Sequence, residues 1–216
     1  TFTASQGLLL MIPTLYKMAG EMLPGVIHVA ARSLATHALS IFGDHQDIYS
    51  VRSTGVCMLA SANPQDAYHM AMVAHLSSIK SSLPFINFFD GFRTSHEISK
   101  VKLVDYDKVK ELIDEKALND FRNRAMSNEN YNTRGTAQND DIYFQNTEVR
   151  NKYYTETVDI VENYMNEINK ITGSEYKPFN YYGAKDATDV IIAMGSVCDT
   201  IRETVDYLNS HGNKYG

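Results

Sequence analysis

Residues 55–89 read GVCMLASANPQDAYHMAMVAHLSSIKSSLPFINFF, and this stretch decides the fold. Two short apolar runs, residues 55–60 and 84–89, flank a longer segment that begins at Asn63-Pro64. Asparagine is a good helix cap, and proline is favoured at the first helical position. The stretch therefore predicts a strand, a helix that ends near Lys80, and a second strand.

The predicted helix is expected to be buried, because its apolar residues spread over most of its circumference. A further apolar run, residues 26–31, predicts a third strand earlier in the chain. Continuous apolar strands separated by helices are typical of a parallel sheet that is covered on both sides. The fold class predicted is therefore α/β, with a parallel sheet and helices on both faces.

Outside this unit the helix signals are weaker. Ser5 is expected to cap an N-terminal helix that Pro13 would kink. The polar middle of the chain predicts a helix from Asp105 or Asp107 to about Met126, a long loop over 127–147, and a helix over 149–172 that ends at Gly173.

The alternation of strand and helix resumes after Pro178. Residues 189–194 predict a strand, Gly195-Ser196 a turn, and residues 198–209 a helix. We therefore expect residues 1–177 to form one α/β domain and residues 178–216 to begin an incomplete second α/β domain. Both ends of the chain resemble cuts through a longer protein.

Composition excludes several classes of protein. With 20 Lys plus Arg against 26 Asp plus Glu, the formal net charge of −6 argues against nucleic-acid binding. The longest apolar run, residues 8–12, is too short to cross a membrane. Two distant cysteines, Cys57 and Cys198, cannot build a four-cysteine metal site and indicate a reducing, cytoplasmic compartment. Each is expected to be a small buried apolar residue.

Candidate site residues follow the predicted strands. Ligands of open parallel sheets bind beyond the carboxyl ends of the strands. Arg32 follows the 26–31 strand, and Arg93 and His96 follow the 84–89 strand, so the three are expected at one edge. The forked guanidinium of Arg32 suits a carboxylate ligand, and a salt bridge that fastens the strand end is the alternative.

Other polar residues are interpreted as structural. The sequence Gly43-Asp44-His45-Gln46-Asp47 contains metal-ligand types, but its spacing favours a loop hydrogen-bond network. His69 and His75 are expected to be core or boundary residues of the buried helix. The sequence carries no phosphate-binding P-loop, no Gly-x-Gly-x-x-Gly after a strand and no Gly-Asp-Gly diphosphate motif.

Four phrases together resemble the pyruvate:ferredoxin (flavodoxin) oxidoreductase family. They are TFTASQGL at 1–8, HVAARSLATHALSIFGDHQD at 28–47, FFDGFRTSHE at 88–97 and RGTAQN at 134–139. The resemblance covers the whole chain in family order. It implies the pyrimidine-type thiamine diphosphate-binding domain, followed by the start of a transketolase C-terminal-like domain.

The resemblance also implies a function. Family members are large cytoplasmic homodimers of anaerobic metabolism that convert pyruvate to acetyl-CoA and CO2. They use thiamine diphosphate with Mg²⁺, [4Fe-4S] clusters and coenzyme A, and they pass electrons to ferredoxin or flavodoxin. Arg32 matches the family arginine that contacts pyruvate, and Arg93 and His96 are expected behind it as second-shell residues. The segment 134–146 resembles one that contacts other domains or the other subunit.

Several functional parts of the family are missing from this chain. A glutamate that binds the aminopyrimidine and a threonine that helps hold pyruvate precede the matching region. The diphosphate–magnesium motif and the cluster cysteines follow it, and Asn139-Asp140-Asp141 departs from the expected Asn-Pro-Asp. We therefore expect no catalytic residue here and no activity or cofactor binding by the chain alone. The alternatives are another 2-oxoacid oxidoreductase and a non-catalytic binding or assembly module.

Overall fold

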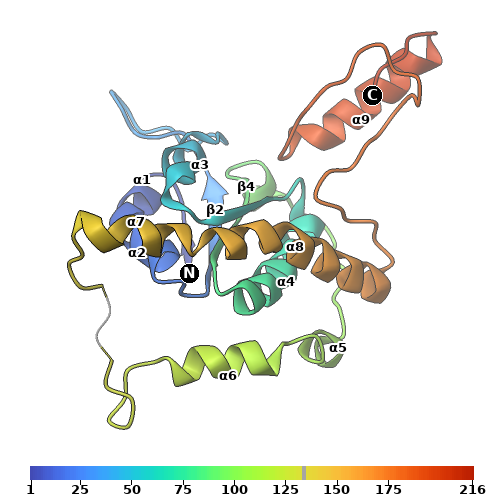
Figure 1. The fold of residues 1–216 in the computed structure, drawn as a ribbon. Helices are drawn as coiled ribbons and strands as arrows, with labels where there is room; N and C mark the ends of the chain where they lie inside the picture. The colour runs from blue at the N-terminus through green and yellow to red at the C-terminus, as the bar shows by residue number, and fades with distance from the viewer. Residues whose placement is uncertain (133–134) are drawn as a thin grey trace.

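The computed structural model describes residues 1–132 and 135–216 and contains a four-stranded, wholly parallel sheet (Figure 1). The strand order is β1-β2-β4-β3. The bounds are Phe2–Thr3 for β1, Gly25–Ala31 for β2, Cys57–Ala60 for β3 and Pro84–Asp90 for β4. The three predicted strands and their parallel arrangement are confirmed, and β1 adds a short edge strand.

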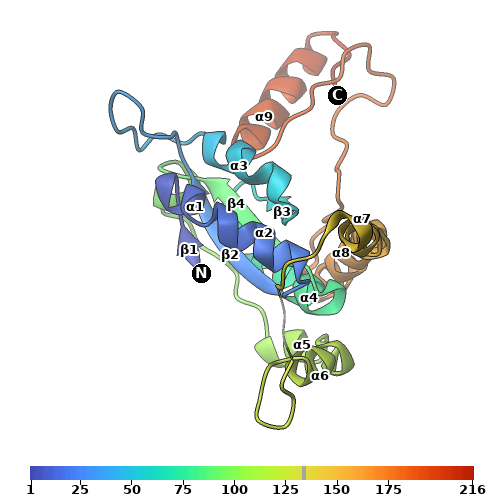
Figure 2. The ribbon, with the colours of Figure 1, turned by 60° about the vertical axis from the view of Figure 1, so that its left-hand side comes forward.

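Helices cover both faces of the sheet, as predicted. On one face, α4 and α8 pack over a core that includes Val73, Phe85 and Ile168. On the other face, α1, α2 and α3 cover a second core that includes Leu15 and Ile86 (Figure 2). The bounds are Gln6–Leu9 for α1, Ile12–Gly20 for α2, Gln46–Val51 for α3, Pro64–Ser81 for α4 and Asn151–Thr172 for α8.

Helix α4 forms as the sequence predicts. The Asn63 side chain accepts a hydrogen bond from the Asp66 backbone N–H at 3.0 Å, and Pro64 occupies the first helical position. Nine of its residues are buried, because β-strands lie on one side and α8 on the other. A residue with left-handed backbone, Ser82 at φ 58°, ends it.

The N-terminal helix is broken rather than kinked. Ser5 has a φ of 51° and makes no side-chain cap, and the chain interrupts the helix between Leu9 and Ile12. Pro13 therefore lies in the first turn of α2, where its missing N–H removes no helical hydrogen bond. The prediction of one capped and kinked helix was wrong in this respect.

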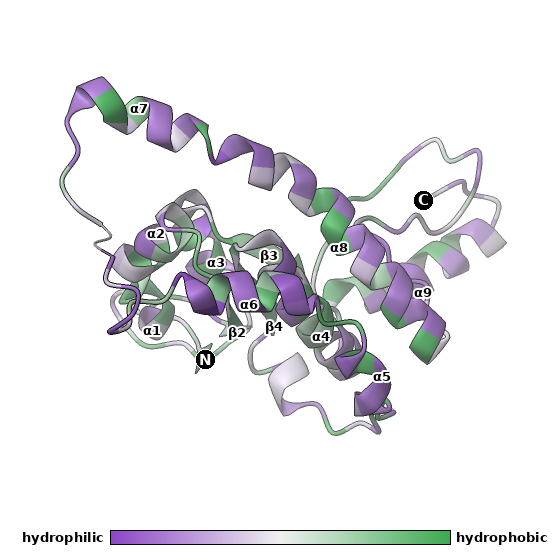
Figure 3. Cartoon of the chain, turned by 60° about the horizontal axis from the view of Figure 1, so that its bottom comes forward, coloured by the Kyte–Doolittle hydropathy of each residue, from purple (hydrophilic) through white to green (hydrophobic). Residues whose placement is uncertain are grey.

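The described residues of the polar middle form more and shorter helices than expected. The helix predicted to end near Met126 is two, α5 (Tyr106–Lys110) and α6 (Glu115–Asn123), because Asp114 caps a second start by accepting from the Ala117 N–H at 2.8 Å. Much of the predicted loop is helix α7 (Asp140–Glu148), which extends the line of α8 beyond the sheet (Figure 3). Two acidic residues in its first turn favour this helix. Thr133 and Arg134 lie outside the described residues.

The predicted strand at 189–194 is not formed. Only Asp189 bridges to Tyr215, and the side chain of Ile192 is 93% exposed. A strand needs a paired neighbour along its length, and here the described chain pairs only the start of the run, through hydrogen bonds of Asp189 and Ile191 with Gly216. The predicted helix is present as α9 (Val197–Ser210), which stands apart from the sheet (Figure 1). The domain division at 177/178 stays a prediction.

Candidate functional site

The carboxyl ends of β2 and β4 lie side by side, because Ala31 is paired in register with Asp90. The Gly91 N–H donates to the Ala31 carbonyl at 2.8 Å, and Arg32 pairs with Gly43 across the same edge. The Arg32 side chain runs directly over Gly91, where an added Cβ would lie 2.5 Å from the Arg32 Cγ. The path of the Arg32 side chain therefore depends on glycine at position 91.

Arg32 has an unused hydrogen-bond donor. Its Nε is buried and has no partner, and no ion pair of its guanidinium is found within residues 1–132 and 135–216. The salt bridge that was the alternative role for this residue is thus not seen in the described chain. An unpaired buried donor carries a desolvation cost, and a carboxylate ligand is the partner that best removes it.

Asp47 organises the backbone around Arg32. Its carboxylate is fully buried and accepts from the N–H groups of Ser5 at 2.8 Å, Arg32 at 3.1 Å and Ile48 at 2.8 Å. Burial raises the pKa of Asp47, while these backbone N–H groups act in the opposite direction. Asp44 likewise accepts from the Gln46 N–H at 2.9 Å, so the predicted hydrogen-bond network at 43–47 is confirmed.

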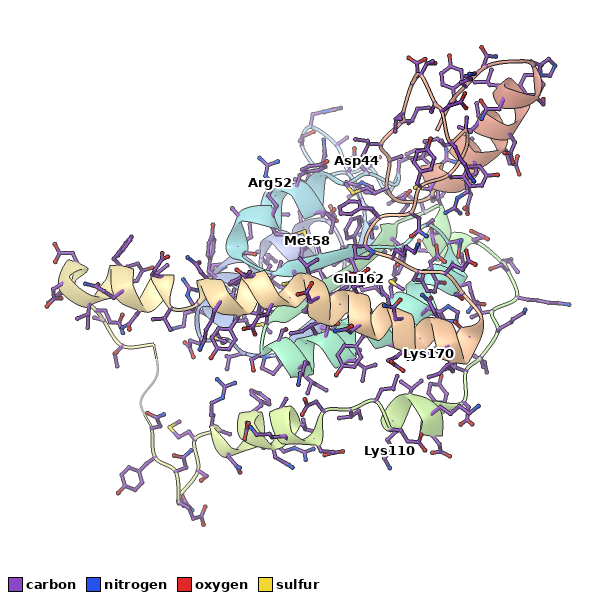
Figure 4. All side chains as sticks on the ribbon, turned by 45° about the vertical axis from the view of Figure 1, so that its right-hand side comes forward. Asp44, Arg52, Met58, Lys110, Glu162 and Lys170 are labelled. Atoms are coloured by element: carbon purple, nitrogen blue, oxygen red, sulfur yellow. The ribbon has the colours of Figure 1, made fainter. Side chains whose placement is uncertain are left out.

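A second cluster connects the sheet to the C-terminal segment. His45 Nε2 lies 2.6 Å from Asp90 Oδ1, and both the hydroxyl and the N–H of Ser196 donate to Asp90 Oδ2. The hydrogen bond to Asp90 raises the pKa of His45, and hydrogen bonds from His45 and Ser196 hold the pKa of Asp90 at about 2 despite its burial. Asp44, Asp90 and Val197 line a hollow of about 360 Å³ beside this cluster. Figure 4 labels Asp44.

Arg93 and His96 lie beyond β4 but are exposed. The Arg93 guanidinium stacks 5.4 Å from the centre of the Phe42 ring, and His96 Nδ1 lies 2.9 Å from the Ser95 hydroxyl. In the described chain neither forms a hydrogen bond with Arg32. That they lie behind Arg32 and support its contact with substrate stays a prediction.

The structure instead gathers Asp47, Gly43 and Gly91 around Arg32, and sequence reasoning assigned no site role to these three. A signal for Asp47 was available, since an acidic residue in the first turn of a helix that follows a sheet-edge loop is well placed to bind backbone N–H groups. Only the fold, however, brings it to Arg32.

Of the other histidines and cysteines singled out in the sequence, His69 is buried as expected, whereas His75 and the two cysteines are more exposed than expected. His69 is buried between Gln65 and Tyr176, with its Nδ1 2.9 Å from the tyrosine hydroxyl, while His75 is exposed. Cys57 and Cys198 are free thiols, both half-buried rather than fully buried, and Cys57 packs against the α4–α8 core.

A family model described as the thiamine diphosphate-binding domain of pyruvate flavodoxin/ferredoxin oxidoreductase matches residues 1–166. The chain belongs to this family. Over all 216 residues it is 58% identical to the pyruvate-flavodoxin oxidoreductase of Enterobacter agglomerans and 54% identical to the pyruvate:ferredoxin oxidoreductase of Moorella thermoacetica. It spans 18% of the length of each of these two family members. The resemblance drawn from the four sequence phrases is confirmed.

The fold also resembles a solved 2-oxoglutarate:ferredoxin oxidoreductase from Magnetococcus marinus, whose structure has 2-oxoglutarate, coenzyme A and succinyl-CoA bound. The TM-score is 0.60, and the likeness covers 100% of this chain and 40% of that chain. At 17% sequence identity this comparison speaks to the fold alone, and it agrees with the α/β assignment.

Two further findings concern the described residues only. None of their helices is long and apolar enough to cross a membrane. No group of three or more His, Cys, Asp or Glu among them could hold a metal ion.

Proposed function

We propose that this chain is the part of a pyruvate:ferredoxin or flavodoxin oxidoreductase that binds pyruvate and faces the pyrimidine side of thiamine diphosphate. The observation that carries the proposal is the unpaired, buried Nε of Arg32 at the carboxyl edge of a parallel sheet. Membership of the family and relatives more than half identical across the whole chain support it.

Arg32 is proposed to bind the pyruvate carboxylate. A guanidinium can donate two parallel N–H bonds to two carboxylate oxygens, which fixes the orientation of a small substrate. In this arrangement the keto carbon is held in one direction, and Arg93 and His96 are proposed to lie behind the arginine. Thiamine diphosphate, when bound, supplies the carbon nucleophile for this keto group.

The complete reaction is proposed for the longer protein. Pyruvate and coenzyme A give acetyl-CoA and CO2, and the two electrons released pass to ferredoxin or flavodoxin through [4Fe-4S] clusters. The ligands for Mg²⁺ and for the clusters are proposed to lie in the rest of the longer protein, as the family resemblance implies. We expect the longer protein to be a homodimer. We expect it in the cytoplasm, a reducing compartment that agrees with two free thiols. This chain alone is expected to have no activity.

The test is Arg32→Ala in the full-length enzyme. A charge-assisted hydrogen bond contributes about 1.5–3 kcal/mol, so the KM for pyruvate should rise roughly 10- to 150-fold. Arg32→Lys keeps the charge but loses the fork, and it should recover only part of the affinity. The same preparations are assayed with 2-oxoglutarate, which would replace pyruvate as the better substrate if the protein were a different 2-oxoacid oxidoreductase.

A thermal melt of the same Arg32→Ala preparation supplies the control. An unchanged KM for pyruvate together with a lower melting temperature would make Arg32 a structural residue and would overturn the proposal.

A further inference from the structure

Asp47 is a buried carboxyl group for which the proposed reaction has no use. Its side chain is fully buried, and burial raises its pKa, so placing a carboxylate here is costly. An asparagine or serine could also have bound the backbone of a helix start. Helix capping alone therefore does not explain why position 47 carries a carboxylate. The explanation has to come from the groups that donate hydrogen bonds to its two oxygens.

The three donors to Asp47 come from three separate parts of the chain. Oδ1 accepts from the N–H of Ile48 at the start of α3, as expected for a residue in the first turn. Oδ2 accepts from two remote groups, the N–H of Ser5 before α1 and the N–H of Arg32 just after β2. One oxygen thus connects the strand end to the N-terminal segment.

The residues on either side of Arg32 are held by the 42–44 loop, because the Asp44 N–H donates to the Ala31 carbonyl at 3.4 Å and the Ser33 N–H donates to the Phe42 carbonyl at 3.2 Å. The partner strand β4 ends at Asp90, and the Gly91 N–H bonds to Ala31, one residue before Arg32. Beyond that point the pairing of Arg32 with Gly43 belongs to a loop. The Asp47 oxygen is the buried acceptor of the Arg32 N–H itself, at the point where the main chain leaves the sheet.

We propose that Asp47 is a positioning residue for substrate binding, which holds the main chain of Arg32 so that its guanidinium meets the substrate carboxylate. This inference rests on the proposed role of Arg32. It assigns Asp47 no contact with substrate and no proton transfer. Its effect is on the affinity for the 2-oxoacid, through the direction of one side chain.

Ser78 provides a matched control at the opposite end of the same strand. Its hydroxyl lies 2.8 Å from the backbone N of Gly25, the first residue of β2, and it is as deeply buried as Asp47. Ser78→Ala removes a buried side-chain contact to β2 far from the carboxyl edge. It should lower stability and leave the KM for pyruvate unchanged.

The experiment uses the full-length enzyme with Asp47→Asn, Asp47→Ala, Ser78→Ala, Arg32→Ala and the double variant Arg32→Ala/Asp47→Asn. Losing or weakening one hydrogen bond to Arg32 should raise the KM for pyruvate about 2- to 12-fold in Asp47→Asn, and more in Asp47→Ala. The KM for coenzyme A should not change in any variant. The double variant should match Arg32→Ala alone, because Asp47 acts only through that residue.

The outcomes separate the two proposals. If Arg32→Ala raises the KM for pyruvate but folded Asp47→Asn does not, the positioning role is overturned and the proposed function stands. If the effects of Asp47 and Arg32 add in full, Asp47 acts independently and the inference is also overturned. If Arg32→Ala leaves the KM unchanged, the proposed function itself fails.

A second measurement covers variants that do not fold. In the wild-type enzyme, hydrogen exchange resolved to single amides should show the Arg32 N–H as protected as the Val29 N–H inside β2. Rapid exchange at Arg32 would show that the Asp47 oxygen does not hold it, and would overturn the inference.

Discussion

Gly91 lies so close to Arg32 and Ala31 that the site has no room for a side chain at this position. A Cβ here would lie 2.5 Å from the Arg32 Cγ and 2.8 Å from the Ala31 carbonyl oxygen. The Arg32 side chain passes directly over this position. The Ala31 carbonyl belongs to a strand that is paired in the parallel sheet. The position therefore admits glycine alone without movement of the strand end.

We predict that Gly91→Ala lowers the free energy of unfolding of the 216-residue chain by about 1–3 kcal/mol, the usual cost of overpacking. In the full-length enzyme it should also raise the KM for pyruvate by displacing Arg32. Gly20→Ala is the control, because its Cβ would meet only Arg150 Nη1 at an ordinary 3.6 Å. Urea unfolding and steady-state kinetics measure the two effects, and equal stability of the two variants would refute the argument.

At the residue scale, sequence reasoning succeeded where the cause was local. Asn63 caps α4, and Gly173 ends α8 with a φ of 73°, because both roles depend on neighbouring residues. Asp47 was interpreted only as part of a loop network. Its two remote donors lie 42 and 15 residues away, and no local pattern encodes that meeting.

At the element scale, the end of β4 is joined to the start of α9 through one carboxylate, Asp90. Its partners, His45 and Ser196, come from the loop before α3 and from the C-terminal segment. Since the pKa of His45 is raised above 6.5 in the folded state, its stabilising effect is complete below pH 6.5 and is lost as pH rises through the raised value. The pKa of Asp90 falls from 3.8 to about 2, so its contribution is present above pH 3.8 and is lost as pH falls toward 2.

We predict that this connection is strongest between about pH 4 and 6.5. Amide exchange in residues 195–210, corrected for its intrinsic pH dependence, should be faster at pH 8.5 than at pH 6. His45→Gln should remove this difference, and an NMR titration should give His45 a pKa above 6.5 that falls in Asp90→Asn. A His45 titration at or below 6.5 in the wild-type chain would contradict the prediction.

Helices and strands could be predicted from the sequence where the apolar residues of the segment itself indicate that it is buried. The strands β2, β3 and β4 are apolar enough to be recognised from composition, and α4 carries its own start signals. The apolar run at 189–194 looks the same in the sequence, yet it forms no strand in the structure. A strand exists only together with its partners, and partners cannot be inferred from the run itself.

At the scale of the whole molecule, the C-terminal segment is held by few contacts. Besides Asp90 and Ser196, Asn63 Nδ2 lies 3.4 Å from Asp199 Oδ2, while the apolar side chains of Val190 and Ile192 are exposed. The sheet, by contrast, is buried on both faces.

We predict that residues 189–208 of the isolated chain exchange their amides much faster than residues 84–89 do. Local stability follows burial and contact, and these differ sharply between the two segments. In the full-length protein the same residues should be protected, if a second domain begins there. Exchange of residues 189–208 as slow as that of residues 84–89 in the isolated chain would show that the boundary at 177/178 is misplaced.

The strand order β1-β2-β4-β3 also bears on how the nascent polypeptide folds. The central pairing joins β2 to β4, so β2 emerges from the ribosome long before the strand that covers its edge. At about 5–20 residues per second, translation of residues 32–83 takes roughly 3–10 s. During that interval Val26, Ile27 and Val29 have no β4 beside them. We therefore expect a chaperone to bind this early apolar strand. Slowed translation should promote aggregation there first.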